Sequence, residues 1–199
     1  MSKELEVARE LVKMLEEREK DNKVELSALT PGEIFKIGGH DFIVLRQEEG
    51  QTRVISKGFM AENVVFDDDT RDYNESNLKK LIETEIQPLI EKEVGAENLV
   101  EHEVDLTSVD AQNEFGICKC KVRLLIFDEV REYNNLLVNK ELNDWWWTCT
   151  PWSTKERGWD YSISVVAPSG CVNFDGCGNR GGVRPFCILK SNIFVSKGE

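Results

Sequence analysis

Six cysteines carry the most reactive side chains of the chain, at positions 118, 120, 149, 171, 177 and 187. In zinc sites the two cysteines of a pair usually have two other residues between them, and a matching second pair follows. Cys118 and Cys120 are too close for this spacing, and Cys171 and Cys177 have no matching pair. A catalytic thiol needs an activating base, and neither of the two histidines lies in a recognisable catalytic motif. We therefore expect free thiols, no catalytic residue, no metal site and no cofactor.

An acidic run, Asp67-Asp68-Asp69, is the second feature with ligand chemistry. Clustered carboxylates bind calcium in EF-hands, but there the acidic residues alternate with other residues and a glutamate follows at a distance. That pattern is missing here. The sequence therefore favours a solvated, irregular acidic loop from Asn63 to Tyr73.

Binding chemistry is concentrated near the end of the chain, where all five tryptophans lie between Trp145 and Trp159. Adjacent aromatic residues in a strand point to opposite faces, so Trp146 and Trp147 are expected to anchor the core. Trp152 and Trp159 lie in a polar loop, where exposed tryptophans are typical binding anchors. Arg184, which precedes a proline, is expected to bind a buried carboxylate or backbone carbonyls.

The net charge is −12, which argues against nucleic acid or an anionic membrane as the main partner. From Trp145 onward the chain carries six basic and four acidic residues, so this segment is +2 and the remainder −14. No apolar run is long enough for a membrane span, and the first residues lack the apolar stretch of a secretory signal. We expect synthesis in the cytoplasm; the final location stays open, with association with a virion as one alternative.

A helix is predicted from residue 2 to about 20, as a separate element within residues 1–22. Its apolar side chains recur at three- and four-residue steps, at Leu5, Ala8, Val12 and Leu15. This spacing fits two heptads, which is short for a stable coiled coil. Two interpretations stay open: a helix packed on its own domain, or an oligomerisation element that makes a homo-oligomer.

The main domain is predicted to span residues 29–195 and to be of the α+β class, because strands come first, a helix follows and short strands close the chain. A hairpin is expected with its connection at 38–41, and Pro88 should kink or end the middle helix. Asp128 is a candidate cap for the second helix. The predicted strands are 34–37, 42–45, 52–56, 104–108, 121–126 and 163–166, and the predicted helices are 77–90 and 127–133.

Five segments, in this order, resemble the motifs of a family of bacterial and phage domains. They are PGEIFKIGGHDFIVL (31–45), NESNLKKL (74–81), LIFDEVREY (125–133), WWTCTP (146–151) and GVRPF (182–186). The resemblance spans roughly residues 29–190, and it implies a C-type-lectin-like fold with antiparallel sheets, helices and a loop-rich C-terminal segment. Members are also similar to the variable proteins of diversity-generating retroelements, in which adenine-directed mutagenesis rewrites a C-terminal surface.

The variable-protein hypothesis can be compared with the residues themselves. An AAY codon with randomised adenines becomes NNY, which never encodes Trp, Met, Lys, Gln or Glu, so Trp152 and Trp159 are not expected to come from such codons. Two runs of alternating small and polar residues, 162–164 and 173–179, place their members on one side of extended segments. The candidate ligand-binding residues are Thr150, Trp152, Ser153, Thr154, Trp159, Tyr161, Ser162, Ser164, Asn173, Asp175, Cys177, Asn179 and Arg180.

These observations favour a non-enzymatic, ligand-binding display protein whose C-terminal surface binds a protein or a glycan, with hypervariability as a further hypothesis. The first alternative is a structural component of a phage tail, fibre or cell envelope, assembled through the N-terminal helix. The second alternative is a thiol or metal enzyme.

Overall fold

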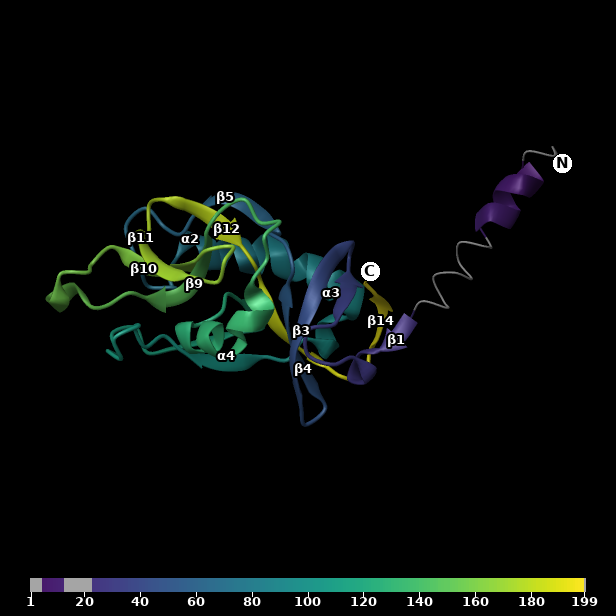
Figure 1. The fold of residues 1–199 in the computed structure, drawn as a ribbon, viewed down its shortest axis with the longest axis horizontal. Coiled ribbons are helices and arrows are strands. Elements are labelled where there is room, and N and C mark those ends of the chain that lie inside the picture. Colours follow the sequence, from purple (N-terminus) through teal and green to yellow (C-terminus); the bar gives the residue numbers. More distant parts are fainter. Residues whose placement is uncertain (1–4, 13–22, 199) are drawn as a thin grey trace.

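The computed structural model describes residues 5–12 and 23–198. They form a mixed α+β fold with mostly antiparallel sheets, which confirms the predicted class (Figure 1). Residues 5–12 are helical and every side chain among them is exposed, so an N-terminal helix is present. The rest of the predicted helix, at 2–4 and 13–20, lies outside the described residues.

The first sheet has seven antiparallel strands. Their order is β1 (Lys23–Glu25), β14 (Phe194–Lys197), β2 (Ile34–Ile37), β3 (His40–Glu48), β4 (Gln51–Ser56), β13 (Phe186–Lys190) and β8 (Val122–Arg123). The predicted strand at 52–56 is confirmed by β4. β1 pairs with β14, so the described body includes Lys23–Glu25, before the predicted start of the domain at 29, and β14 contains residue 195, its predicted end.

The turn between β2 and β3 is tighter than the predicted connection of 38–41. Ile37 pairs directly with His40, so only Gly38 and Gly39 form the turn. Their φ angles are 56° and 83°. A two-residue turn with positive φ at both positions matches the twist of a hairpin and strongly favours glycine. The predicted hairpin is therefore confirmed, with a shorter connection.

The second sheet contains most of the C-terminal segment. Its order is β11 (Val172–Gly176), β10 (Ser162–Val166), β9 (Trp146–Pro151), β12 (Arg180–Val183) and β5 (Ala61–Val65), and only the β9–β12 pair is parallel. The expectation that 63–73 is irregular throughout is wrong at its start, because β5 pairs with β12.

A third, two-stranded sheet pairs β6 (His102–Asp105) with β7 (Ile117–Cys120). The strand predicted at 104–108 overlaps β6 at Val104 and Asp105, and the strand predicted at 121–126 contains β8, whereas β7 was not predicted. Cys118 pairs with Val104, and Cys118, Val104 and Cys120 all face the core. Inward and outward side chains alternate along β6 and β7, whereas the prediction followed the apolar run at 122–126.

The middle helix begins as predicted and continues beyond Pro88. Ser76 caps α2 (Asn77–Leu81) by accepting a hydrogen bond from the Lys79 N–H at 3.1 Å. A π-helical turn, η2 (Ile82–Ile86), follows and leads into α3 (Gln87–Val94). Pro88 therefore falls in the first turn of α3, where proline is tolerated. The π turn also rotates the inward face, so Ile90 is buried and Leu89 is exposed.

The second predicted helix is α4 (Phe127–Leu137), and its start is not capped by Asp128. The Glu129 carboxylate accepts from the Ile126 N–H at 3.0 Å, and the Thr150 hydroxyl accepts from the Phe127 N–H at 2.9 Å. These two contacts satisfy donors that a helix start leaves open. Three short 3-10 turns complete the described elements, at η1 (Leu26–Ala28), η3 (Ala96–Asn98) and η4 (Lys155–Arg157).

Two hydrophobic clusters lie on the two faces of β9. The segment from Gly182 to Phe186 crosses from the second sheet, through β12, to the first sheet, through β13 (Figure 1). The last part of the chain therefore belongs to both sheets and holds them together.

Candidate ligand-binding surface

Trp146 and Trp147 fix β9 from its two faces. Both are fully buried, and each belongs to a different hydrophobic cluster. The Trp147 indole N–H donates to the Val64 carbonyl at 2.8 Å, and the Arg184 guanidinium lies 5.0 Å from the centre of the Trp146 ring. The prediction that both tryptophans anchor the core is confirmed.

Arg184 is fully buried and bonds backbone carbonyls, as predicted. Its Nε donates to Ser56 O at 3.0 Å and its Nη1 to Leu137 O at 2.9 Å. Burial lowers the pKa of Arg184 to about 10. The arginine ties the segment after β4 to the end of α4.

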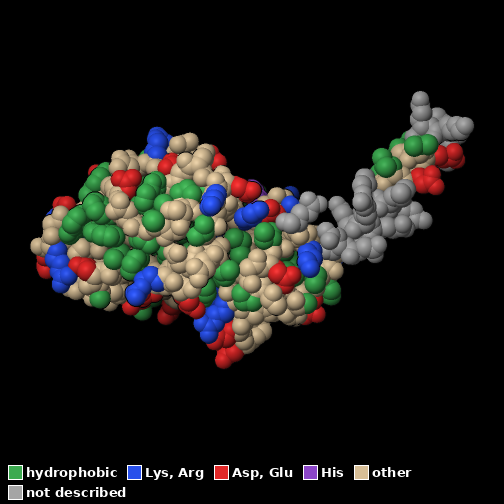
Figure 2. Space-filling view, in the orientation of Figure 1, with side chains coloured by type: hydrophobic (Ala, Val, Ile, Leu, Met, Phe, Trp, Pro, Cys, Tyr) green, Lys and Arg blue, Asp and Glu red, His purple; other side chains and the backbone are tan. Residues whose placement is uncertain are grey.

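Trp152, Trp159 and Phe174 pack against one another and form an aromatic cluster. Their ring centroids are 6.3 Å apart for the two tryptophans, 5.1 Å for Trp152 and Phe174, and 4.8 Å for Trp159 and Phe174. Both tryptophans are half-buried, and Phe174 is 40% exposed. Hydrophobic side chains gather over the end of the molecule where β10 and β11 lie (Figure 2). The cluster is thus a packed but accessible apolar surface.

Tyr161 lies against the turn between β11 and β12 and is 44% exposed. A Cβ at Gly178 would collide with the Tyr161 hydroxyl, and a Cβ at Gly176 would be in tight contact with the Tyr161 ring, at 3.0 Å. The Tyr161 side chain therefore packs directly against the backbone at the end of β11 and in the turn that follows. This tyrosine is held in place and still faces solvent.

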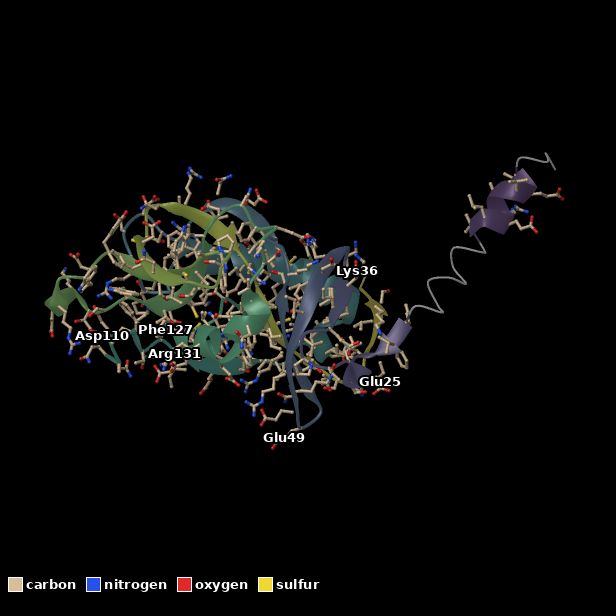
Figure 3. The ribbon with its side chains drawn as sticks, viewed as in Figure 1. Glu25, Lys36, Glu49, Asp110, Phe127 and Arg131 are labelled. Carbon is tan, nitrogen blue, oxygen red and sulfur yellow. The ribbon has the colours of Figure 1, made fainter. Side chains whose placement is uncertain are left out.

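Asp110 supports the loop that carries Trp152 and Trp159. Its carboxylate accepts hydrogen bonds from the Ser108 and Ser153 hydroxyls, both at 2.6 Å, and pairs with Arg157. These contacts, those with Ser108 first, lower the pKa of Asp110 to about 2. Asp110 lies at the same end of the molecule in Figure 3.

Arg71 makes a second, buried connection between the same loops. It is 3% exposed; Nη1 donates to Ser153 O at 2.5 Å, and Nη2 contacts Glu114 Oε2 at 2.5 Å. Its guanidinium also lies 4.9 Å from the centre of the Phe115 ring. The acidic segment at 106–116 is therefore fastened to the aromatic loop.

The predicted ligand-binding residues fall into three groups by exposure. Exposed residues are Tyr161, Asn173, Asn179 and Arg180. Half-buried residues are Trp152, Thr154, Trp159, Ser162 and Asp175. Buried residues are Thr150, Ser153, Ser164 and Cys177.

The buried group makes contacts within the domain instead of facing a ligand. Thr150 caps α4, Ser153 binds Asp110, and Ser164 bonds the Thr148 hydroxyl. Cys177 is fully buried in the larger hydrophobic cluster. The candidate surface therefore excludes these residues.

The two alternating runs lie on opposite faces of the second sheet. Ser164 pairs with Phe174, whereas Val165 pairs with Asn173. Directly opposed residues share a face, so Ser164 and Asn173 lie on different faces. The serine run shares its face with the aromatic cluster, and the Asn173 run points the other way.

The exposed polar residues of the β11–β12 turn are held by short contacts. The Asn179 amide donates to the Asp175 carboxylate at 2.5 Å, and Arg180 Nη1 donates to Asn63 O at 2.6 Å. These bonds give the turn a defined shape and leave part of each polar group open to solvent.

Phe174, Asp110 and Arg71 were not among the predicted site residues. An aromatic residue in a short, polar strand was a usable signal for Phe174. No local pattern identifies Asp110 or Arg71, because their partners are distant in sequence.

Most of the thiols are buried. All six cysteines are free, and only Cys171 is exposed. Burial raises the pKa of Cys149 and Cys187 to about 12, which keeps both protonated at neutral pH. Within residues 5–12 and 23–198, no group of three or more His, Cys, Asp or Glu side chains could hold a metal ion.

No protein-family model, characterised protein or solved structure matches this chain. Among the helices in the described ranges, none is long and apolar enough to cross a membrane.

Proposed function

We propose that this protein is a non-enzymatic ligand-binding display protein with a C-type-lectin-like fold, which binds a protein or a glycan through the aromatic cluster. The observation that carries this proposal is the accessible packing of Trp152, Trp159 and Phe174 on a braced loop and an edge strand. Large aromatic side chains that are already held in place lose little entropy on binding and give much contact area.

The framework around the cluster supports the same proposal. Arg71 and Asp110 hold the loop from the 106–116 side, and the buried Trp146 and Trp147 hold β9 beneath it. A binding surface whose supporting residues are locked needs less reorganisation when a ligand arrives.

If the surface is hypervariable, fewer positions are expected to vary than the sequence alone suggested. Buried Thr150, Ser153, Ser164 and Cys177 are expected to stay constant, because each makes contacts that the domain needs. The positions open to variation are Thr154, Tyr161, Ser162, Asn173, Phe174, Asp175, Asn179 and Arg180. Of these, Ser162 and Phe174 lie on the face of the aromatic cluster, and Asn173 and Asp175 lie on the other face of the sheet. Sequencing this locus across related strains should show adenine-directed changes at these codons; an invariant segment from 150 to 180 would end the hypervariable version.

A matched pair of phenylalanine variants tests the binding surface. Labelled full-length protein would be applied to a glycan array and to intact bacterial cells with and without protease treatment. Phe174→Ser should lower retention about tenfold, the scale of one lost hot-spot contact. Phe194→Ser, exposed in β14 of the other sheet, should not. Equal retention of both variants and the parent would refute the proposed surface.

The N-terminal helix favours the second candidate, a structural phage or envelope component. Leu5, Val7, Leu11 and Val12 are each 47–62% exposed, and a short isolated helix is marginal in water without a partner. Deletion of residues 2–20 should then reduce the oligomeric state measured by light scattering. An unchanged mass would count against assembly through this helix.

A further inference from the structure

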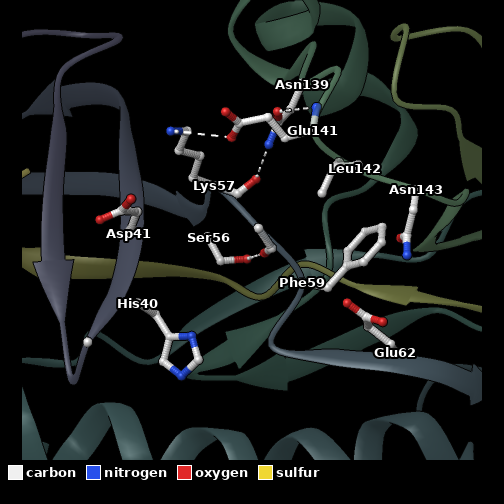
Figure 4. A pocket seen from close by; sticks show the side chains of 12 residues that line it. His40, Asp41, Ser56, Lys57, Phe59, Glu62, Asn139, Glu141, Leu142 and Asn143 are labelled. Atoms are coloured by element: carbon white, nitrogen blue, oxygen red, sulfur yellow. Dashed lines mark hydrogen bonds and ion pairs between the residues drawn. The ribbon is translucent and has the colours of Figure 1, made fainter. Parts of the chain in front are cut away.

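A concave site, which we call the polar cleft, lies away from the aromatic cluster and shares no residue with it. Its volume is about 380 Å³, within the range of small-molecule sites. It lies between the β2–β3 turn, the segment after β4 and the loop that joins α4 to β9 (Figure 4). The side chains that line it include His40, Lys57, Phe59, Glu62, Glu141 and Asn143.

Phe59 provides an apolar wall whose position is fixed by Gly182. A Cβ at Gly182 would meet three carbons of the Phe59 ring within 2.6 Å, so only glycine lets the ring lie directly on this backbone. The ring is half-buried and lies beside Glu62 and Asn143 in Figure 4. The cleft therefore has one flat aromatic surface that packs against backbone.

The opposite wall is held by contacts of the α4–β9 loop. Lys57 Nζ lies 3.7 Å from Glu141 Oε2, and the Asn139 amide donates to Lys57 O at 3.0 Å. The Asn139 side-chain oxygen also accepts from the Glu141 N–H at 3.0 Å. The shape of this wall exists before any ligand arrives.

Three polar groups of the cleft remain available. The side chains of His40, Glu62 and Asn143 are exposed, and none has a hydrogen-bond or ion-pair partner among residues 5–12 and 23–198. Together they offer an imidazole, a carboxylate and a carboxamide. This set contains both donors and acceptors of hydrogen bonds.

Three carboxylates, Asp41, Glu62 and Glu141, and one ammonium, Lys57, line the cleft, so its charges disfavour an anion. Asp41 is paired with Lys36 and Glu141 with Lys57, so Glu62 is the carboxylate of the cleft that has no ion-pair partner among residues 5–12 and 23–198. A neutral ligand with several hydroxyls suits this lining, because a hydroxyl can donate to the Glu62 carboxylate and accept from the Asn143 amide. The C–H face of a sugar ring also matches the apolar face of Phe59.

We infer that the polar cleft binds a neutral saccharide ring. Phe59 packs against one face of the ring, and Glu62 and Asn143 bond its hydroxyls. This site is independent of the aromatic cluster, so it adds a second ligand-binding site to the protein and does not rest on the function proposed above.

The test is an amide-resolved NMR titration of the full chain with three neutral glycosides: methyl α-glucoside, methyl α-mannoside and methyl β-galactoside. Saturable shifts with at least one glycoside are expected at amides of residues 57–62 and 139–143. Glu62→Ala and Asn143→Ala should each weaken binding about tenfold, the effect of losing one strong hydrogen bond. Both sites are exposed, so the fold should persist, and the spectrum itself shows whether it does.

Matched controls are Glu85→Ala and Asn135→Ala, which are exposed and outside the cleft and should leave affinity unchanged. Larger shifts at the cleft with choline or inorganic phosphate than with any glycoside would overturn the neutral-saccharide assignment. Shifts confined to residues 152–176 would also overturn it, although they would support glycan binding by the aromatic cluster. Absence of saturable shifts with all three glycosides would refute the inference outright.

Discussion

Arg123 and Glu129 form a buried ion pair that is joined by His102. The guanidinium contacts both carboxylate oxygens of Glu129 at 2.6 Å, and Arg123 Nε donates to His102 Nε2 at 2.9 Å. The other ring nitrogen of His102 lies 3.1 Å from Val100 O, so it carries the proton in this arrangement. The guanidinium also lies 4.3 Å from the centre of the Phe186 ring. His102 must stay neutral to accept from Arg123.

Stability should therefore fall as the pH is lowered through the ordinary range of histidine. Burial, and then the charge of Arg123, lower the pKa of His102 from 6.5 to about 4. Below pH 6.5 His102 binds a proton in the unfolded chain but not in the folded chain, and this favours unfolding. Between pH 7 and pH 5 the free energy of unfolding should drop by about 1–2 kcal/mol. Urea unfolding at the two pH values measures this change.

Two glutamine variants isolate the contribution of this histidine. His102→Gln keeps a hydrogen-bond acceptor but cannot titrate, so most of the pH dependence between 7 and 5 should disappear. His40→Gln, at the exposed histidine of the β2–β3 hairpin, should retain it. An identical pH dependence in His102→Gln and the parent would refute the assignment.

Single residues were predictable where a local pattern determines their environment. The burial of Trp146 and Trp147 follows from strand alternation, whereas for Arg184 the sequence left a buried carboxylate and backbone carbonyls as alternatives, and the structure shows carbonyls. Thr150 and Ser164 have side chains that are usually exposed. They are buried because α4 and β9 bring partners from distant segments, which no local pattern encodes.

At the scale of elements, the acidic segment at 106–116 acts as a brace for the loop between β9 and β10. Asp110 is the point where Ser108, Ser153 and Arg157 meet. Asp110→Ala removes three contacts at once. Hydrogen exchange of the amides in residues 152–161 should become about tenfold faster, which is a loss of about 1.4 kcal/mol of local protection.

A second acidic residue provides the control for the brace. Asp128 is paired with Arg131 on the surface of α4, and its side chain is 80% exposed. Asp128→Ala should leave exchange at 152–161 unchanged, because such an exposed pair contributes little. Equal exchange in both variants would show that the 106–116 segment does not hold the loop.

Elements with strong local signals were found from the sequence, and those that depend on partners were not. The glycine pair of the first hairpin and the Ser76 cap act within a few residues. The π turn that carries the helix past Pro88 and the pairing of β5 with β12 both depend on packing against other parts of the chain. Their positions follow from tertiary contacts, which override local propensity.

At the scale of the whole molecule, the folded body should require the residues from Lys23 to Ala28. β1 pairs with β14, and Leu26 is fully buried in the larger hydrophobic cluster. A chain that starts at Lys23 should keep the stability of the full chain. A chain that starts at Leu29 should lose about 2–5 kcal/mol, the cost of removing a buried leucine, plus the pairing of β1. Urea unfolding of the two truncated proteins measures the difference.

Leu26→Ala in the full chain measures the stability lost with the Leu26 side chain alone, without the removal of residues 23–28. It should account for most of the destabilisation of the shorter chain. If the chain beginning at Leu29 is as stable as the one beginning at Lys23, β1 and η1 are dispensable and the body starts where the sequence suggested. The sequence does not mark β1, because a three-residue strand carries almost no pattern of its own.

The pairing of β1 with β14 also has a consequence for synthesis. A ribosome must produce about 170 further residues after Lys23 before the partner strand at 194–197 exists. Strands β2, β3 and β4 can pair early, but the outer edges that later receive β14 and β13 stay open in the meantime. Open strand edges are templates for pairing with other chains. The nascent protein is therefore most prone to aggregation just before β13 and β14 emerge, and slower elongation through the codons of these two strands would extend that period.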